Sequence, residues 1–512
     1  MFVRIAAGAV AGIDAVTVSV EVNVAAAGQL GLFLVGLPDN AVKESEQRIR
    51  SAFENTGLRM TGKKLVVNLA PADLRKEGAG FDLPIAVGIL AAMGRIDAGA
   101  VAGTMFVGEL SLDGSLKPVR GVLPVAVRAR SEGLRRVVLP AENAAEAAVV
   151  DGIEVIGATT LRQVVGYLNG EAEIAPAVPA DDEPFAAAAT HYAEDFADVR
   201  GQTHVKRALE IAAAGGHNVI MVGAPGSGKT MLARRLPTIL PPLSREEALE
   251  TTKIHSVAGK AGVTGGLMTR RPFRAPHHTA SQVAVIGGGQ SPRPGEVSLA
   301  HNGVLFLDEL PEYDRGALEA LRQPLEDGFV SVVRVSAQAK YPARAMFVAA
   351  MNPCPCGNYG SSTQPCRCTQ KEIARYLGRI SGPLLDRIDM QLEVTAVPVR
   401  QITESAPEEP SEAIHARVQA ARRRQQARYA GEGVSSNAEL SARQLEQFCP
   451  LDDACRELIG KACDKYNLSM RAVSRVRKVA RTIADLAGEE NIGKAHILEA
   501  LRYRNLEGNY WK

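Results

Sequence analysis

A glycine-rich segment, GAPGSGKT at residues 223–230, constrains the fold of this chain more than any other part of its sequence. The β-branched run NVIMV precedes the segment directly, and the helix-forming run MLARRL follows it. The order strand, tight turn and helix gathers backbone N–H groups and the positive end of a helix around one point, an arrangement that binds phosphate. The segment therefore predicts an α/β core with a phosphate-binding loop after one of its strands.

Two side chains at the end of this loop specify the ligand further. The ammonium group of Lys229 is expected to reach the β- and γ-phosphates of a nucleotide, and the hydroxyl of Thr230 to bind Mg²⁺. We therefore expect ATP and Mg²⁺ as cofactors. The residues predicted to bind the nucleotide are Gly223, Ala224, Pro225, Gly226, Ser227, Gly228, Lys229 and Thr230.

Two further strands are predicted to bring catalytic groups to the same site. The apolar run GVLFL ends in Asp308, which would orient Mg²⁺, and Glu309, which would polarise the attacking water. The run AMFVAAM ends in Asn352, whose amide would help to position that water. Phosphoryl transfer is catalysed mainly by positioning and charge stabilisation, so the site requires cations besides the loop lysine. Arg387 and Arg471 are the candidates.

The bulk composition limits the remaining possibilities. A length of 512 residues suggests about three domains. The 46% of hydrophobic residues is typical of a globular protein, and the net charge of +2 means that any nucleic-acid surface must be a local patch. No apolar run is long enough to span a membrane. The apolar run after Arg4 does not read as a signal peptide, because it is short and is closed by Asp14. We therefore expect a cytoplasmic protein.

Changes in composition and in the pattern of apolar residues predict the domain borders. Residues 1–170 alternate β-like runs with alanine-rich helical stretches, which indicates one α/β domain. Residues 171–194 are rich in Ala, Pro and acidic side chains and read as a linker. The α/β core with a parallel sheet is expected over residues 195–400, and a helical domain over residues 401–512.

Four of the seven cysteines lie close together, at Cys354, Cys356, Cys366 and Cys368. In an intracellular chain this spacing points to metal rather than to disulfides. Four thiolates can surround a tetrahedral Zn²⁺ and would leave no open position for a substrate. A structural Zn²⁺ is therefore the favoured interpretation, and a reduced loop without metal is the alternative.

The blocks around these motifs resemble one family along essentially the whole chain. They include DVRGQTHVKRALEIAAAGGHNVIMVGAPGSGKT, RPFRAPHHTAS, AHNGVLFLDELPEY, AAMNPCPCG, CRCT and RISGPLLDRIDM. These blocks resemble the magnesium-chelatase-like AAA+ ATPases of the ComM/YifB family, whose clade also includes the MCM helicases. The resemblance implies a bacterial, hexameric ATPase; within that family, ComM is associated with branch migration of DNA during natural transformation.

The resemblance also assigns roles to two arginines and to a hairpin. Arg387 matches the arginine finger, which acts in trans on ATP held by the neighbouring subunit, and Arg471 matches the sensor 2 arginine of the helical lid. Residues 326–344 would form a β-hairpin that points into the pore of the ring. Its charges Arg334 and Lys340 would contact the DNA backbone, and two ordinary hairpin charges are an equally good interpretation.

The N-terminal domain resembles the proteolytic domain of Lon without the catalytic pair. Residues 76–86 (KEGAGFDLPIA) and 106–143 carry this resemblance. Gly80 stands where the serine nucleophile belongs, and Leu123 stands where the lysine base belongs. Neither residue can perform that chemistry. We therefore expect an inactive scaffold that serves in binding or ring assembly.

The segment IHARVQAARRRQQAR at residues 414–428 carries five arginines. Solvated or inter-subunit positions and contacts with DNA phosphates both remain open, and the first is favoured.

The leading functional hypothesis is a hexameric, ATP-driven motor on branched or single-stranded DNA, promoting branch migration or unwinding during recombination. The alternative is a magnesium-chelatase-like ATPase that remodels a protein partner. An ATP-dependent protease is disfavoured by Gly80 and Leu123.

Overall fold

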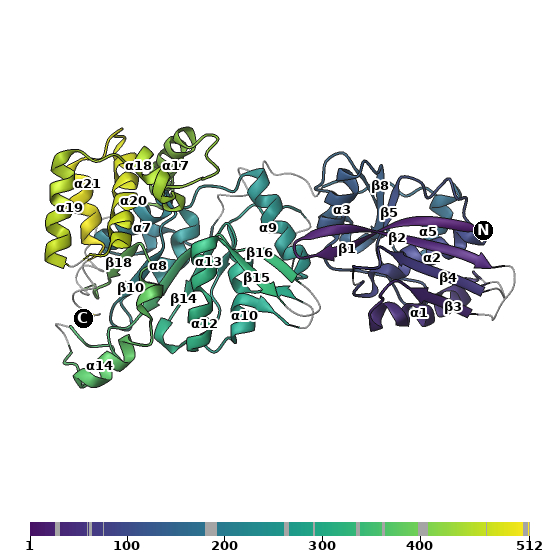
Figure 1. The fold of residues 1–512 in the computed structure, drawn as a ribbon, viewed down its shortest axis with the longest axis horizontal. Helices are drawn as coiled ribbons and strands as arrows, with labels where there is room; N and C mark the ends of the chain where they lie inside the picture. The colour runs from purple at the N-terminus through teal and green to yellow at the C-terminus, as the bar shows by residue number, and fades with distance from the viewer. Residues whose placement is uncertain are drawn as a thin grey trace. The chain divides into compact units, whose positions relative to one another are not determined.

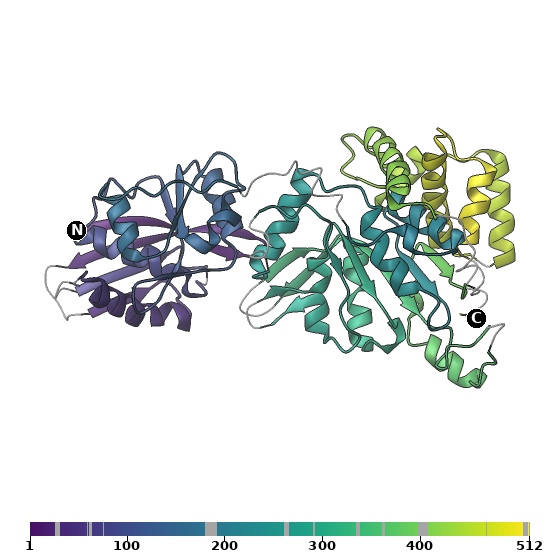
Figure 2. The ribbon, with the colours of Figure 1, turned by 180° about the vertical axis from the view of Figure 1, so that it is seen from behind.

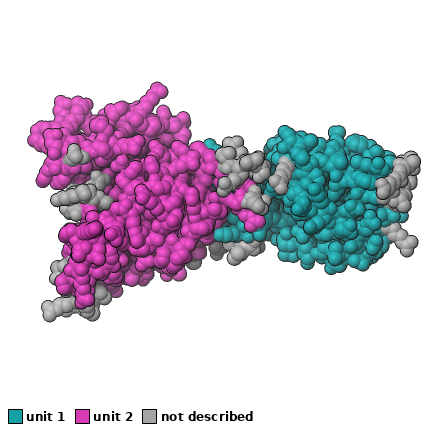
Figure 3. Space-filling view, turned by 60° about the horizontal axis from the view of Figure 1, so that its bottom comes forward, with its two compact units in different colours: residues 1–184, 245–268, 333–341 teal, residues 185–244, 269–332, 342–512 magenta. Residues whose placement is uncertain are grey.

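The computed structural model describes the chain of 512 residues apart from several short stretches. Its described residues are 1–25, 31–58, 60, 64–74, 76–179, 192–260, 266–289, 292–333, 338–360, 364–397, 408–466, 468–504 and 510. Two compact units are present, and each includes segments that are far apart in the sequence (Figure 3). One unit contains residues 1–184, 245–268 and 333–341, and the other contains residues 185–244, 269–332 and 342–512.

The N-terminal unit is built on a seven-stranded mixed sheet (Figure 1). Its first two strands form a long antiparallel hairpin in which Phe2 lies opposite Asn23, and the last three strands are parallel to one another. In order across the sheet the strands are β3 (Gly31–Val35), β4 (Lys64–Ala70), β2 (Asp14–Ala25), β1 (Phe2–Ala11), β5 (Thr104–Phe106), β8 (Arg136–Pro140) and β9 (Glu154–Ala158).

Helices cover this sheet because their apolar side chains have no other place to be buried. All eleven residues of α2 (Asp82–Ala92) are buried, which explains why its sequence is apolar after Asp82, whose carboxylate pairs with Arg48. The remaining principal helices are α1 (Asn40–Thr56), α3 (Val122–Ser131) and α5 (Leu161–Leu168). The unit therefore has the mixed α/β fold that the sequence predicted.

Helix α9 (Arg245–Val257) belongs to this N-terminal unit although its sequence lies after the phosphate-binding loop. It packs against α3, and the N–H of Gly121 donates to the carbonyl of Ser256 at 3.2 Å. An ion pair joins Lys253 to Asp14. The chain therefore leaves the second unit at residue 245 and returns to it after residue 268. Nothing in the composition of this segment indicated that it belongs to the N-terminal unit.

The second unit contains a five-stranded parallel sheet (Figure 1). Because all five strands are parallel, every connection between them is a crossover, and all carboxyl ends lie at one edge of the sheet. The strands, in order, are β11 (Phe273–Arg274), β14 (Val304–Leu307), β17 (Met346–Met351), β10 (Val219–Val222) and β18 (Met390–Glu393). The predicted parallel sheet is confirmed.

The C-terminal helices share a hydrophobic core with this sheet. Helix α7 (Thr203–Gly215) packs between the two (Figure 2). Buried Val219, Ile414 and Val476 belong to one hydrophobic cluster. The C-terminal helices are α17 (Ser411–Arg428), α18 (Ala442–Phe448), α19 (Asp453–Tyr466), α20 (Met470–Ala487) and α21 (Lys494–Arg502). None of the helices in the described ranges is long and apolar enough to cross a membrane.

Candidate nucleotide site

The phosphate-binding loop connects β10 to α8 (Lys229–Arg235) at the carboxyl edge of the sheet. Gly226 and Gly228 have φ values of 76° and 92°, which favour glycine. Gly223 is required for a different reason, since a Cβ there would lie 2.2 Å from the carbonyl oxygen of Val394. Its N–H donates to the carbonyl of Met351 at 3.2 Å, so the loop begins against β17.

Lys229 is 7% exposed and its ammonium group is held within the loop. Nζ donates to the carbonyls of Gly223 at 2.6 Å and Ala224 at 2.9 Å, and it lies 3.4 Å from Oδ1 of Asn352. Burial lowers the pKa of Lys229, and the charges of nearby acidic side chains oppose this shift. The structure therefore brings the predicted loop lysine and the predicted asparagine together.

Thr230 and Asp308 also meet at this edge. The hydroxyl of Thr230 donates to Oδ2 of Asp308 at 2.6 Å, and the N–H of Glu309 donates to Oδ1 of the same carboxylate at 2.9 Å. A hydroxyl and a carboxylate are hard oxygen ligands of the kind that Mg²⁺ prefers. The two predicted magnesium ligands are therefore adjacent and fit that ion.

Glu309 lies beside a histidine that the sequence analysis did not select. Its backbone is left-handed, with φ of 52°, and its Oε2 lies 3.3 Å from Nδ1 of His278. The His278 ring makes an edge contact with Tyr313, whose hydroxyl donates to the carbonyl of Pro276 at 2.5 Å. The block RPFRAPHHTAS contained the signal, because two adjacent histidines follow the short strand β11.

Arg387 lies at the opposite edge of the sheet. It precedes β18, and its carbonyl accepts a hydrogen bond from the side chain of Asn218, which precedes β10. The guanidinium forms an ion pair with Glu326 and donates to the carbonyl of Arg322 at 3.2 Å. At about 3.3 Å per residue, a four-residue strand separates this edge from the phosphate-binding loop of the same chain by roughly 13 Å.

The two arginines near the start of α20 differ in their surroundings. Arg471 is exposed in the first turn of the helix. Arg475, one turn later, forms an ion pair with Asp389, which is 3% exposed. Burial raises the pKa of Asp389, but the charge of Arg475 and contacts with His217 and Asn218 hold it well below its ordinary value. Arg475 therefore supports the fold, and Arg471 remains the accessible cation.

The four clustered cysteines converge after β17. Their sulfur atoms all lie within 4.8 Å of one another, and the Sγ distances from Cys354 are 3.4 Å to Cys356 and 3.7 Å to Cys366. A tetrahedral zinc site with Zn–S bonds near 2.3 Å has sulfurs roughly 3.8 Å apart. The geometry of Cys354, Cys356, Cys366 and Cys368 is compatible with that ion.

The predicted hairpin is present as β15 (Phe329–Val333) and β16 (Gln338–Pro342). Lys340 is exposed on β16, and Arg334 lies outside the described residues. A second short hairpin, β12 (Gly287–Gly288) and β13 (Arg293–Pro294), was not predicted. This hairpin begins directly after α10 (Gln282–Ile286), and His278 lies four residues before the start of that helix.

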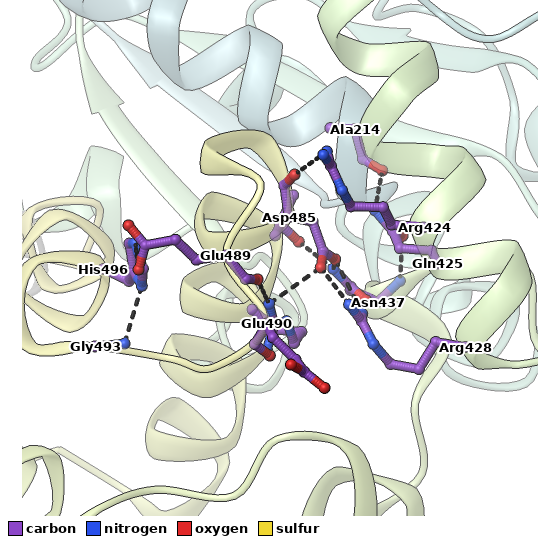
Figure 4. A network of polar contacts seen from close by, with 12 residues as sticks. Ala214, Arg424, Gln425, Arg428, Asn437, Asp485, Glu489, Glu490, Gly493 and His496 are labelled. Atoms are coloured by element: carbon purple, nitrogen blue, oxygen red, sulfur yellow. Dashed lines mark hydrogen bonds and ion pairs between the residues drawn. The ribbon is translucent and has the colours of Figure 1, made fainter.

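The arginine-rich segment forms α17, and most of its guanidinium groups bond within the unit. Arg428 binds both carboxylate oxygens of the fully buried Asp485, and Arg424 donates to the carbonyl of the same residue at 2.9 Å (Figure 4). Arg422 donates to the carbonyl of Ala213. The two open interpretations, solvated or inter-subunit positions and contacts with DNA, did not anticipate these bonds within the unit.

The two positions of the N-terminal unit that match the catalytic serine and lysine of Lon carry no reactive group. Gly80 lies in a single turn of helix, and Leu123 is fully buried in α3. The surroundings of Leu123 are an apolar cluster that includes Val107, Val125 and Leu139. The unit keeps the scaffold without a nucleophile or base at these positions.

Comparison with known proteins identifies the class. A model described as magnesium chelatase, subunit ChlI, matches residues 195–402, a model of the ChlI subunit matches residues 20–143, and a C-terminal ChlI model matches residues 408–504. Together with the site geometry, these matches define an AAA+ ATPase of the magnesium-chelatase type, which implies ATP and Mg²⁺ as cofactors.

The chain belongs to the ComM/YifB family within that class. It is 44% identical over 494 residues to the competence protein ComM of Haemophilus influenzae, covering 96% of this chain and 95% of the relative. Two shorter matches concern parts of the chain. Lon protease 2 of Bacillus subtilis is 30% identical over 145 residues, covering 28% of this chain and 24% of the protease. The DNA replication licensing factor mcm6 of Dictyostelium discoideum is 27% identical over 191 residues, covering 37% and 18%.

Proposed function

We propose that the chain forms a hexameric ring in the cytoplasm and uses ATP hydrolysis to move along branched or single-stranded DNA. Its task would be branch migration or unwinding during recombination in natural transformation. The observation that carries the ATPase part is the meeting of Lys229 with Asn352 and of Thr230 with Asp308 at one edge of the sheet. Side chains from three strand ends converge there.

The residues at this edge have distinct roles in the proposed reaction. Lys229 would exchange its bonds to the loop carbonyls for bonds to the β- and γ-phosphates, which neutralises charge on the transferred group. Thr230 and Asp308 would hold Mg²⁺, which supplies charge stabilisation when bound. Glu309 and Asn352 would orient the attacking water.

The position of Arg387 supports the proposed ring. Its backbone adjoins the amino ends of β10 and β18, whereas the phosphate-binding loop of the same chain follows the carboxyl end of β10. An arginine at that edge would stabilise a transferred phosphoryl group at the site of another copy. Arg471, exposed on α20, would supply the second cation from the helical region.

DNA as the partner is supported by the names of two relatives and by the charges of the β15–β16 hairpin. One relative is named a competence protein and another a DNA replication licensing factor. Exposed Lys340, with Arg334, would contact phosphates in the pore without reading bases. The second candidate function, remodelling of a protein partner, is favoured by the magnesium chelatase models that match the chain.

The test is the ATPase rate with and without forked DNA at low salt. We expect DNA to bind and to stimulate hydrolysis, with affinity that falls steeply as salt rises because the contacts are to phosphates. The double variant Arg334→Ala, Lys340→Ala should keep the basal rate and lose the stimulation. If forked DNA neither binds nor stimulates the wild-type chain, the motor proposal fails and protein remodelling becomes the better account.

The cysteine cluster is proposed to hold one structural Zn²⁺ per chain through its four thiolates. Elemental analysis of freshly purified, reduced protein should find about one zinc per chain. The variant Cys366→Ser should lower that content, whereas Cys463→Ser, outside the cluster, should leave it unchanged. Reduced protein without metal would contradict the assignment.

A further inference from the structure

The loop that carries the cysteines touches the phosphate-binding loop. Gly357 has φ of 79°, and a Cβ on it would lie 2.4 Å from Cδ and 2.7 Å from Cγ of Pro225. These distances are shorter than any normal carbon contact, so only a hydrogen atom fits between the two residues. Pro225 has a fixed φ and cannot move its ring without moving the loop backbone.

Two other contacts join the same pair of loops. The N–H of Gly223 donates to the carbonyl of Met351 at 3.2 Å, and Nζ of Lys229 lies 3.4 Å from Oδ1 of Asn352. Residues 351–357 therefore support the phosphate-binding loop at its beginning, at Pro225 and at its end.

Gly357 is in turn fixed by the cysteines. Its N–H donates to the carbonyl of Cys354 at 3.0 Å, and the N–H of Tyr359 lies 3.3 Å from Cys354 Sγ. Cys354 is fully buried, and Cys356 precedes Gly357 directly. Anything that loosens the cysteine cluster would release the turn that rests on Pro225.

We propose that Gly357 is a positioning residue for nucleotide binding, through which the folded cysteine loop holds the phosphate-binding loop in its binding conformation. The inference rests on the proposed nucleotide site. A loop that must keep Gly226 and Gly228 in left-handed conformations loses affinity when it is not pre-organised, because ordering it then costs part of the binding energy. The affinity for nucleotide thus depends on the state of the four cysteines.

The chain offers a matched pair of variants. Gly357 and Gly360 have φ of 79° and 76°, so alanine strains the backbone similarly at both positions. At Gly360 the nearest atom to an added Cβ is the hydroxyl of Tyr510 at 3.8 Å, an ordinary contact. Only the alanine at Gly357 presses on the phosphate-binding loop.

The experiment is a titration of the full-length chain with a fluorescent ADP analogue. We expect Gly357→Ala to weaken binding by about tenfold or more and Gly360→Ala by less than about twofold, because small misplacements of binding groups have large effects. In a Pro225→Ala background, which lacks the ring atoms that clash, adding Gly357→Ala should cause a much smaller loss of affinity than it causes in the wild-type chain. Equal affinities of the two glycine variants would overturn the inference.

A second variant covers the case in which Gly357→Ala does not fold. Cys356→Ser weakens the cluster without adding atoms near Pro225, and it should also weaken ADP binding, whereas Cys463→Ser should not. Unchanged ADP affinity in Cys356→Ser would contradict the inference. A wild-type chain that binds no ADP would instead refute the proposed nucleotide site, so the two failures are distinguishable.

Discussion

The carboxyl edge of the five-stranded sheet and the C-terminal helices both carry many charged side chains, but these side chains have different partners. At the sheet edge, Lys229 and Thr230 follow β10 and Asp308 follows β14, and their side chains contact one another or loop carbonyls. In the helices, Arg428 and Arg475 are bound to buried carboxylates of their own unit. Position at a strand end therefore indicates function better than the density of charge does.

The largest expected effect distinguishes binding from turnover at the sheet edge. Lys229→Ala should abolish detectable nucleotide binding, whereas Glu309→Gln should bind ATP and reduce turnover by about 10²–10³-fold, the scale of losing one transition-state contact. Glu312→Gln is the control, since this exposed acid pairs with Arg379. Turnover in Glu309→Gln close to that of Glu312→Gln would contradict the role of Glu309.

A smaller effect, on the free energy of unfolding, is expected at the ion pair between Arg475 of α20 and the buried Asp389. Arg475→Ala would leave the carboxylate of Asp389 buried without its main partner, which costs about 3–5 kcal/mol in the free energy of unfolding. Arg471→Ala, at an exposed position of the same helix, should change this free energy by less than about 0.5 kcal/mol. Denaturant titration at neutral pH measures both values.

The difference in the free energy of unfolding between wild type and Arg475→Ala should depend on pH. The folded chain lowers the pKa of Asp389, so the stability from this group is present above the ordinary carboxyl pKa and is lost as pH falls toward the folded value. The difference between wild type and Arg475→Ala should therefore shrink in acid. A difference that grows as pH falls would mean that Asp389 is not the partner that matters.

The smallest effects are expected at Arg423, one of the exposed arginines of α17. Among the residues that the structure describes, Arg423 bonds to Gln419 alone, weakly at 3.3 Å, so Arg423→Ala should alter the free energy of unfolding by less than about 0.5 kcal/mol. Arg428→Ala should cost several times more, because Asp485 is fully buried. If Arg423 nevertheless contacts DNA, its loss should reduce the salt slope of binding by about one unit. Equal stabilities of the two variants would remove the contrast between them.

The sheet-edge residues could be predicted because their signals are local. A strand, a glycine-rich turn and a helix lie within one short segment, and Asp308 and Asn352 each end an apolar run. Parallel strands then bring these ends together without further information. The cysteine cluster was predictable for a similar reason, since its four cysteines lie on one loop.

The remainder depends on contacts between distant segments. The sequence around α17 shows a run of arginines, but not that Asp485, which lies on α20, faces it. Nor does it show that α9 packs with the N-terminal unit or that His278 lies beside Glu309. Tertiary packing determined these contacts, and no single segment specifies both partners of any of them.

The claim that the site is shared between two copies of the chain is tested most directly by mixing two inactive variants. Arg387→Ala keeps its phosphate-binding loop, and Lys229→Ala keeps Arg387, so each should hydrolyse little ATP alone. Mixed rings contain interfaces at which an intact loop faces an intact arginine, and we expect these to restore part of the ATPase rate. Arg387→Ala protein that hydrolyses ATP at the wild-type rate, or mixtures that remain as inactive as their components, would contradict the account.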